Sequence, residues 1–198
     1  MKKITVLTLL LISSFAIAQK MKVKKGDFKK LKGITEFNVE FDYSNLKVDK
    51  FNTEEEFLAD KMKKREEKGT DEDFKASWFS DRENRYEPKF IESFNKRFDK
   101  GEVKIDKANT TAKYTIKVKT TWIYPGYNVG VTRQPAKINT TIYVYETSNP
   151  EEILLVVDYD KALGNGAMGF DYNSGYRISE AYAKLAKTFA GDIKKGTK

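Results

Sequence analysis

Three consecutive runs of residues between Ala112 and Asp160 constrain the fold more strongly than any other part of the chain. The first run, from Lys113 to Ile123, alternates strictly between a largely apolar set and a set of lysines and threonines. A period of two is typical of a half-buried β-strand, so we expect the lysines to face solvent and the other set to need cover. That set is Tyr114, Ile116, Val118, Thr120 and Trp122.

Two further runs follow after short connections. Residues 136–145 repeat the alternation, and residues 153–159 are nearly all apolar, which predicts a more buried strand. Asn149 and Pro150 lie between them and favour a turn. Strands joined by short connections pair as antiparallel neighbours, so the three runs together predict an antiparallel meander.

The strand directions of this meander predict that two loops meet at one end of the sheet. The loop after the first strand and the loop after the third strand both contain glycine, asparagine and tyrosine, which are common in adaptable recognition surfaces. We therefore expect a ligand-binding end, although loops also collect these residues without any binding role. The candidate residues are Tyr124, Tyr127, Asn128 and Arg133 from the first loop, and Asn165, Asp171, Tyr172 and Tyr176 from the second.

The remaining segments predict one more strand and several helices. Residues 35–43 alternate as a strand, and Thr53 and Thr70 each precede acidic residues, as expected at helix N-termini. Pro88 fits the first turn of a further helix, and residues 178–193 repeat apolar side chains at helical spacing. The phenylalanines and tryptophan of the middle helices are interpreted as core. The order predicts an α+β two-layer domain with a mainly antiparallel sheet of four to five strands and helices packed on one face.

The N-terminus reads as an export signal. Two lysines precede a short apolar run and a small-residue site that ends at Ala18, so residues 1–18 are predicted to be a cleaved signal peptide. The run is too short to span a membrane, and no second one follows, so no transmembrane segment is expected after cleavage. The chain has no cysteine, which excludes lipidation and disulfides. A periplasmic or secreted location is expected.

The net charge of +8 comes entirely from the first 32 residues, because the charges of the rest of the chain balance. We expect residues 19–32 to form a basic flexible arm and residues 33–198 to form a single domain. The arm would either aid solubility or attach to an anionic surface. Nucleic acid is not an expected partner, because the body has no basic excess. The candidate anionic-surface residues are Lys20, Lys22, Lys24, Lys25, Lys29, Lys30 and Lys32.

The absence of histidine and cysteine excludes most hydrolytic mechanisms. Ser-His-Asp and Cys-His catalysis and thiolate zinc sites all require those residues. Asp158, Asp160 and Asp171 lie near glycine-rich loops and leave a carboxylate-dependent glycan hydrolase as an alternative. The glycines of residues 164–169 lack the helix of a dinucleotide site, and residues 171–175 lack the distal acid of a calcium loop. No catalytic residue, cofactor or metal is predicted.

Three segments carry a resemblance to a known group of proteins. They are the strand ending at residues 41–43 (FDY), residues 112–118 (AKYTIKV), and residues 175–182 (GYRISEAY) opening the last helix. Their order resembles that of small exported envelope proteins of Bacteroidetes-type bacteria, which are similar in fold to the amino-terminal domain of TolB and to transport-auxiliary lipoproteins. The resemblance covers most of residues 33–194 and implies a non-enzymatic envelope role. The leading hypothesis is a binding or adaptor protein with an envelope protein or glycan as its partner.

Overall fold

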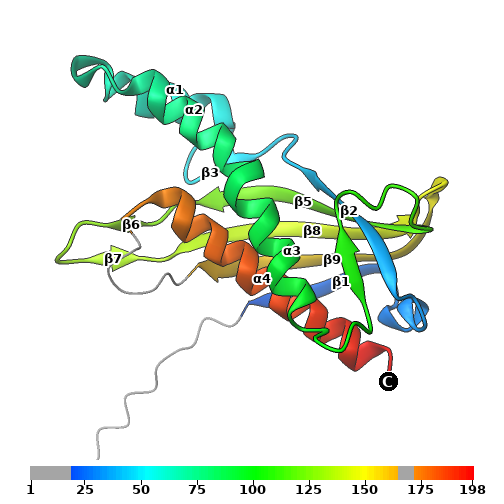
Figure 1. Cartoon of the computed structure of the whole chain (residues 1–198). Coiled ribbons are helices and arrows are strands. Elements are labelled where there is room, and N and C mark those ends of the chain that lie inside the picture. The colour runs from blue at the N-terminus through cyan, green and yellow to red at the C-terminus, as the bar shows by residue number, and fades with distance from the viewer. Residues whose placement is uncertain (1–18, 165–171) are drawn as a thin grey trace, which may run out of the picture.

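The computed structural model describes residues 19–164 and 172–198 and contains one mixed sheet with helices on one face (Figure 1). The sheet has seven strands in the order β1-β9-β8-β5-β2-β4, with β3 also paired to β5. The α+β prediction is confirmed, and the sheet is larger than the four to five strands expected. Its strands are β1 (Lys20–Gly26), β2 (Glu36–Asp42), β3 (Lys47–Val48), β4 (Lys104–Asp106), β5 (Tyr114–Tyr124), β8 (Ala136–Glu146) and β9 (Asn149–Gly164).

The predicted meander is confirmed as β5, β8 and β9, which pair antiparallel in sequence order. The pairs Tyr124 with Lys137 and Ala136 with Gly164 lie at the same end of the sheet. The two loops therefore leave from one end, as the strand directions predicted. By contrast, β2 pairs parallel to both β4 and β5, because a helical crossover separates it from them in sequence.

One side chain of β5 lies on the opposite face from the one predicted. The register shifts between Thr120 and Trp122, so Trp122 is on the helix-free face and Ile123 is buried in the core instead. A bulge adds one residue to a strand and exchanges the two faces beyond it, which strict alternation of the sequence cannot indicate. Trp122 donates its Nε1 hydrogen to the carbonyl oxygen of Asp49 at 2.9 Å and stacks beside Tyr124.

The prediction of a flexible arm is wrong for most of residues 19–32. Lys20–Gly26 is the edge strand β1, paired antiparallel with β9, and Phe28–Leu31 is a short 3-10 helix that buries Phe28 and Leu31. Met21 and Val23 alternate with lysines, which is a strand pattern. The high charge of the segment led to the interpretation as a flexible arm instead. Lysines on an edge strand also discourage pairing with another chain.

The helices are α1 (Glu54–Lys63), α2 (Asp71–Asp81), α3 (Glu87–Asn95) and α4 (Ser174–Gly196), with a short 3-10 turn at Glu66–Lys68. A π-helical turn, Arg82–Tyr86, joins α2 to α3, so the two predicted helices form one continuous rod (Figure 1). Pro88 lies just after this turn and has no N–H to donate to it.

The helices α3 and α4 cover the sheet, and α1 packs against β3. The apolar stripe predicted for the last helix is confirmed, since its side chains are all buried. Within the described residues, no helix is both long and apolar enough to cross a membrane. The stripe consists of Ile178, Tyr182, Leu185, Phe189 and Ile193.

Candidate functional site

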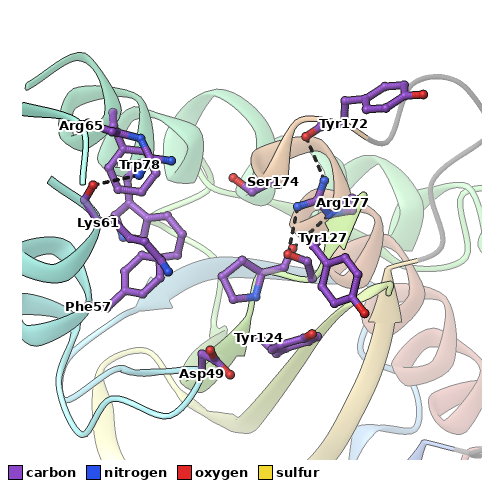
Figure 2. A pocket seen from close by; sticks show the side chains of 13 residues that line it. Asp49, Phe57, Lys61, Arg65, Trp78, Tyr124, Tyr127, Tyr172, Ser174 and Arg177 are labelled. Atoms are coloured by element: carbon purple, nitrogen blue, oxygen red, sulfur yellow. Dashed lines mark hydrogen bonds between the residues drawn. The ribbon is translucent and has the colours of Figure 1, made fainter. Parts of the chain in front are cut away.

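A cleft of about 390 Å³ lies at the end of the sheet where the two loops leave the meander. One wall comes from α1 and α2, and the other from the end of β5, the following turn and the start of α4 (Figure 2). The lining combines aromatic rings with three cations and one acid. The lining residues are Asp49, Phe57, Lys61, Arg65, Phe74, Trp78, Tyr124, Pro125, Gly126, Tyr127, Tyr172, Ser174 and Arg177.

The first wall is a cluster of three aromatic rings. Phe57 of α1 lies with its ring centroid 4.8 Å from that of Trp78 and 6.3 Å from that of Phe74, both on α2. The indole N–H of Trp78 donates to Glu54 at 2.6 Å, and Arg82 forms an ion pair with the same carboxylate. Phe57 and Trp78 are buried and Trp78 is hydrogen-bonded, so packing and this bond hold the two rings in place.

Two cations border the aromatic cluster at the end of α1. The guanidinium of Arg65 lies 4.1 Å from the ring centroid of Phe74 and donates to the carbonyl oxygen of Lys61 at 2.8 Å. Lys61 lies 5.5 Å from the ring centroid of Phe57 and 3.4 Å from a carboxylate oxygen of Asp60. Cations near a helix C-terminus are favoured by its dipole, so these two positions are stable without a ligand.

The opposite wall begins at Tyr124, the last residue of β5. Burial raises the pKa of the Tyr124 hydroxyl above its ordinary value, so the ring presents a neutral phenol at physiological pH. Gly126 has a φ of +65°, and a Cβ there would collide with the carbonyl oxygen of Gln134. The chain can therefore turn from β5 into β6 (Tyr127–Asn128) only with glycine at this position.

Arg177 joins the second wall to α4. Its side chain is 5% exposed, and its guanidinium donates to the carbonyl oxygens of Pro125 and Gly126, each at 3.1 Å, and of Tyr172 at 3.0 Å (Figure 2). A buried cation that binds backbone carbonyls fixes the turn after β5 and the segment before α4 in one arrangement. Sequence reasoning missed Arg177, because it lies beside the apolar stripe of α4 and belongs to no motif.

A second groove of about 410 Å³ adjoins the cleft and shares Arg65, Phe74, Trp78, Tyr172 and Ser174 with it. Asp81 lies on its floor, and burial raises the pKa of this carboxyl although Arg85 is only 2.7 Å away. The two hollows are therefore neighbours, and Phe74 and Trp78 line both of them. The additional residues of the groove are Thr70, Asp73, Ser77, Asp81 and Asn173.

The structure brings together part of the predicted binding end. Tyr124, Tyr127 and Tyr172 line the cleft, whereas Asn128 and Arg133 lie outside it on the hairpin formed by β6 and β7 (Arg133–Gln134). Tyr176 is in the first turn of α4 and does not line the cleft. Asn165 and Asp171 lie outside the described residues, as does most of the glycine-rich segment 164–169. The residues that sequence reasoning missed, apart from Arg177, are mainly the helix aromatics, which it assigned to the core alone.

The lysines predicted to bind anionic surfaces are all exposed, from Lys20 on β1 to Lys32 after the 3-10 helix. Asp158, one of the acids considered for hydrolysis, accepts a hydrogen bond from Thr141 at 2.8 Å and lies 3.5 Å from Lys24. Across residues 19–164 and 172–198, no group of three or more acidic side chains is placed to hold a metal ion.

Comparisons with known proteins give one distant structural match. No family model matches the chain, and no curated protein does. A solved structure of a PelC variant dodecamer from Paraburkholderia phytofirmans is similar over 84% of this chain and 99% of that chain. The sequence identity is 12% and the TM-score is 0.37, and a similarity this distant carries no argument about function or assembly.

Proposed function

We propose that the chain is an exported, non-enzymatic binding protein of the cell envelope whose ligand occupies the cleft between the α1–α2 pair and the end of β5. The observation that supports this proposal is the pairing of an aromatic wall with cations at its border. A volume of about 390 Å³ is within the range of small-molecule sites. The adjoining groove leaves room for a longer ligand, such as one end of a glycan or peptide.

The lining favours an anionic ligand with a flat or apolar body. The partly exposed aromatic rings of the lining provide contact faces at low conformational cost, and Lys61 and Arg65 stand where an acidic group of the ligand would reach them. Asp49 is the one acid in the lining, so the cations outnumber it. A carboxylate, sulfonate or phosphate attached to a ring-shaped body satisfies both features.

The alternative of a glycan hydrolase has weaker support. Asp158 is held by Thr141 and Lys24 on the helix-free face of the sheet, and it does not line the cleft. A panel of glycans incubated with the protein tests this alternative directly. Turnover that disappears in Asp158→Asn would support hydrolysis over the binding proposal.

Binding can be tested with a fluorescent aromatic anion, anilinonaphthalene sulfonate, and its neutral relative, phenylnaphthylamine. Phe74 and Phe79 both lie on α2, but only Phe74 lines the cleft, so Phe79→Ala is a matched control for Phe74→Ala. Losing a ring contact of about 0.5–1.5 kcal/mol predicts a two- to tenfold weaker dissociation constant for Phe74→Ala. Equal affinities in the two variants would refute the site.

The charge part of the proposal needs a second comparison. Arg65→Met should weaken the sulfonate dye several-fold while leaving the neutral dye within about twofold, because only the anion gains from the guanidinium. The natural ligand can then be sought by photo-crosslinking in the native cell from position 172, whose exposed tyrosine borders the cleft. Crosslinks that persist when Phe74→Ala is combined with the photoreactive residue would contradict occupancy of the cleft.

Attachment to an anionic surface through the lysines is a second proposal, favoured by the exposure of all seven side chains. Deleting residues 20–32 would remove the edge strand β1, so substitution is the cleaner test. Replacing Lys29, Lys30 and Lys32 with serine should lower retention on anionic vesicles at low salt and change little at high salt. Identical retention at low salt would remove this proposal.

A further inference from the structure

Exposed apolar side chains gather at one tip of the molecule. Among the described residues, Val131 is 96% exposed and Val129 is 64% exposed, and both lie in the turn of the hairpin formed by β6 and β7 (Arg133–Gln134). Tyr127 at 39% and Tyr172 at 64% are exposed beside the hairpin base. Single exposed apolar residues are ordinary, but such a cluster marks an interaction surface.

The tip is an ordered, convex turn. Asn128 pairs with Arg133, the amide of Val129 donates to the carbonyl of Thr132 at 3.1 Å, and the amide of Gly130 donates to the Asn128 side chain at 2.9 Å. A Cβ placed on Gly130 would meet nothing within 4 Å, and the hairpin extends past the sheet as a finger (Figure 1). A convex hairpin turn with two valines at its end is suited to inserting into a lipid bilayer or into a pocket of another protein.

The charged residues within the hairpin and most of the strand that follows it are basic. From Pro125 to Tyr145 the sequence has no aspartate or glutamate, and its charged residues are Arg133 and Lys137. The hairpin has aliphatic side chains at its end, tyrosines at its base and cations behind them. Proteins that bind membranes place these three kinds of side chain in the same order, from the acyl chains outward to the charged headgroup surface. Tyrosine is enriched at headgroup depth, and basic residues are attracted by anionic lipids.

We propose that the β6–β7 tip docks onto an anionic phospholipid bilayer. Val129 and Val131 enter the boundary between headgroups and acyl chains, while Tyr127 and Tyr172 lie at headgroup depth. This inference goes beyond the ligand cleft, because neither valine lines the cleft, although Tyr127 and Tyr172 border both surfaces. Two valines bury little apolar surface, so docking is weak and reversible and gains from the anionic charge.

The absence of cysteine from the chain allows a site-specific test on the full mature protein. Val131→Cys carries an environment-sensitive nitrobenzoxadiazole label, and Ser148→Cys, in the exposed turn at the other end of the meander, is the control. With vesicles of phosphatidylcholine and phosphatidylglycerol, the label at 131 should shift to shorter wavelength and brighten at least twofold. The label at 148 should not change. Equal responses at the two positions would overturn the proposal.

Vesicle sedimentation of the unlabelled chain provides the second readout. Val131→Asp should lower the partition coefficient at least tenfold, whereas Phe79→Asp, at another exposed apolar position, should change it by less than twofold. If the wild type does not sediment with vesicles, but Val131→Asp abolishes capture of an envelope protein, the tip binds a protein pocket and the bilayer proposal is wrong. Unchanged partitioning of Val131→Asp would also overturn it.

Discussion

Replacing Arg177 with glutamine should destabilise the fold far more than replacing any exposed arginine. The guanidinium is buried and makes three charge-assisted hydrogen bonds to the carbonyls of Pro125, Gly126 and Tyr172. Each such bond contributes about 1.5–3 kcal/mol, and a glutamine amide can replace only part of the three. We expect the free energy of unfolding to fall by about 3–5 kcal/mol, and Tm to fall by about 6–20 °C.

Urea unfolding followed by tryptophan fluorescence measures this loss. Arg97, exposed in the turn after α3, offers a matched control, because Arg97→Gln should stay within about 0.5 kcal/mol of the wild type. Arg177→Lys should fall between the two, since a lysine keeps the charge but cannot reach three carbonyls in the same plane. A loss below about 1 kcal/mol in Arg177→Gln would show that the arginine does not hold the cleft wall together.

Three further predictions concern the packing around the cleft. Gly164→Ala should destabilise the fold by more than about 2 kcal/mol, because its Cβ would collide with the Arg177 carbonyl, whereas Gly191→Ala on the open face of α4 should stabilise it by about 0.5–1 kcal/mol. Urea unfolding compares the two variants. A change in the free energy of unfolding with the same sign in both would contradict the packing at Gly164. Tyr182→Phe should cost about 1–3 kcal/mol, because its hydroxyl bonds Thr120 at 2.6 Å in the core. If the costs of Tyr182→Phe and Thr120→Val simply added in the double variant, that bond would be contradicted. Burial raises the pKa of Asp81 above 3.8, so the stability that this carboxyl contributes is complete below pH 3.8 and is lost as the pH rises through its folded-state pKa. Asp81→Asn should lack that loss when urea unfolding is measured at pH 3 and pH 7. If the free energy of unfolding changed equally with pH in the wild type and the variant, the raised pKa would be refuted.

The meander and the last helix could be predicted because local periodicity decides them. The alternation of β5 and β8 and the helical spacing in α4 are properties of neighbouring residues, and the buried sets match them up to the bulge. The bulge itself, and the pairing of β1 with β9, depend on contacts between distant segments. The lysines of β1 give this segment the composition of a solvated arm. Only its pairing with β9 makes it an ordered edge strand of the sheet.

The sequence allowed the wall of the cleft at the end of β5 to be predicted, but not the wall formed by α1 and α2. Strand direction brings Tyr124 and Tyr172 to one end, which topology alone determines. The wall of Phe57, Phe74 and Trp78 uses residues that also belong to the core, or pack against it, and a helical apolar stripe does not show where the core stops and a cleft begins. The role of Arg177 could not be predicted for a related reason. Its partners are backbone carbonyls, and no pattern of side chains in the sequence indicates them.

Arg177 also connects the two proposed surfaces, and this connection separates them experimentally. The carbonyls of Pro125 and Gly126 that it binds belong to the turn at the base of the β6–β7 hairpin, and the same turn forms part of the second wall of the cleft. A loosened turn therefore disturbs both the dye site and the orientation of the valine tip. In the folded state, Phe74→Ala should weaken dye binding alone, Val131→Asp should weaken vesicle docking alone, and Arg177→Lys should weaken both. If Arg177→Lys left either property at the wild-type level, the two surfaces would not share this turn as their common support.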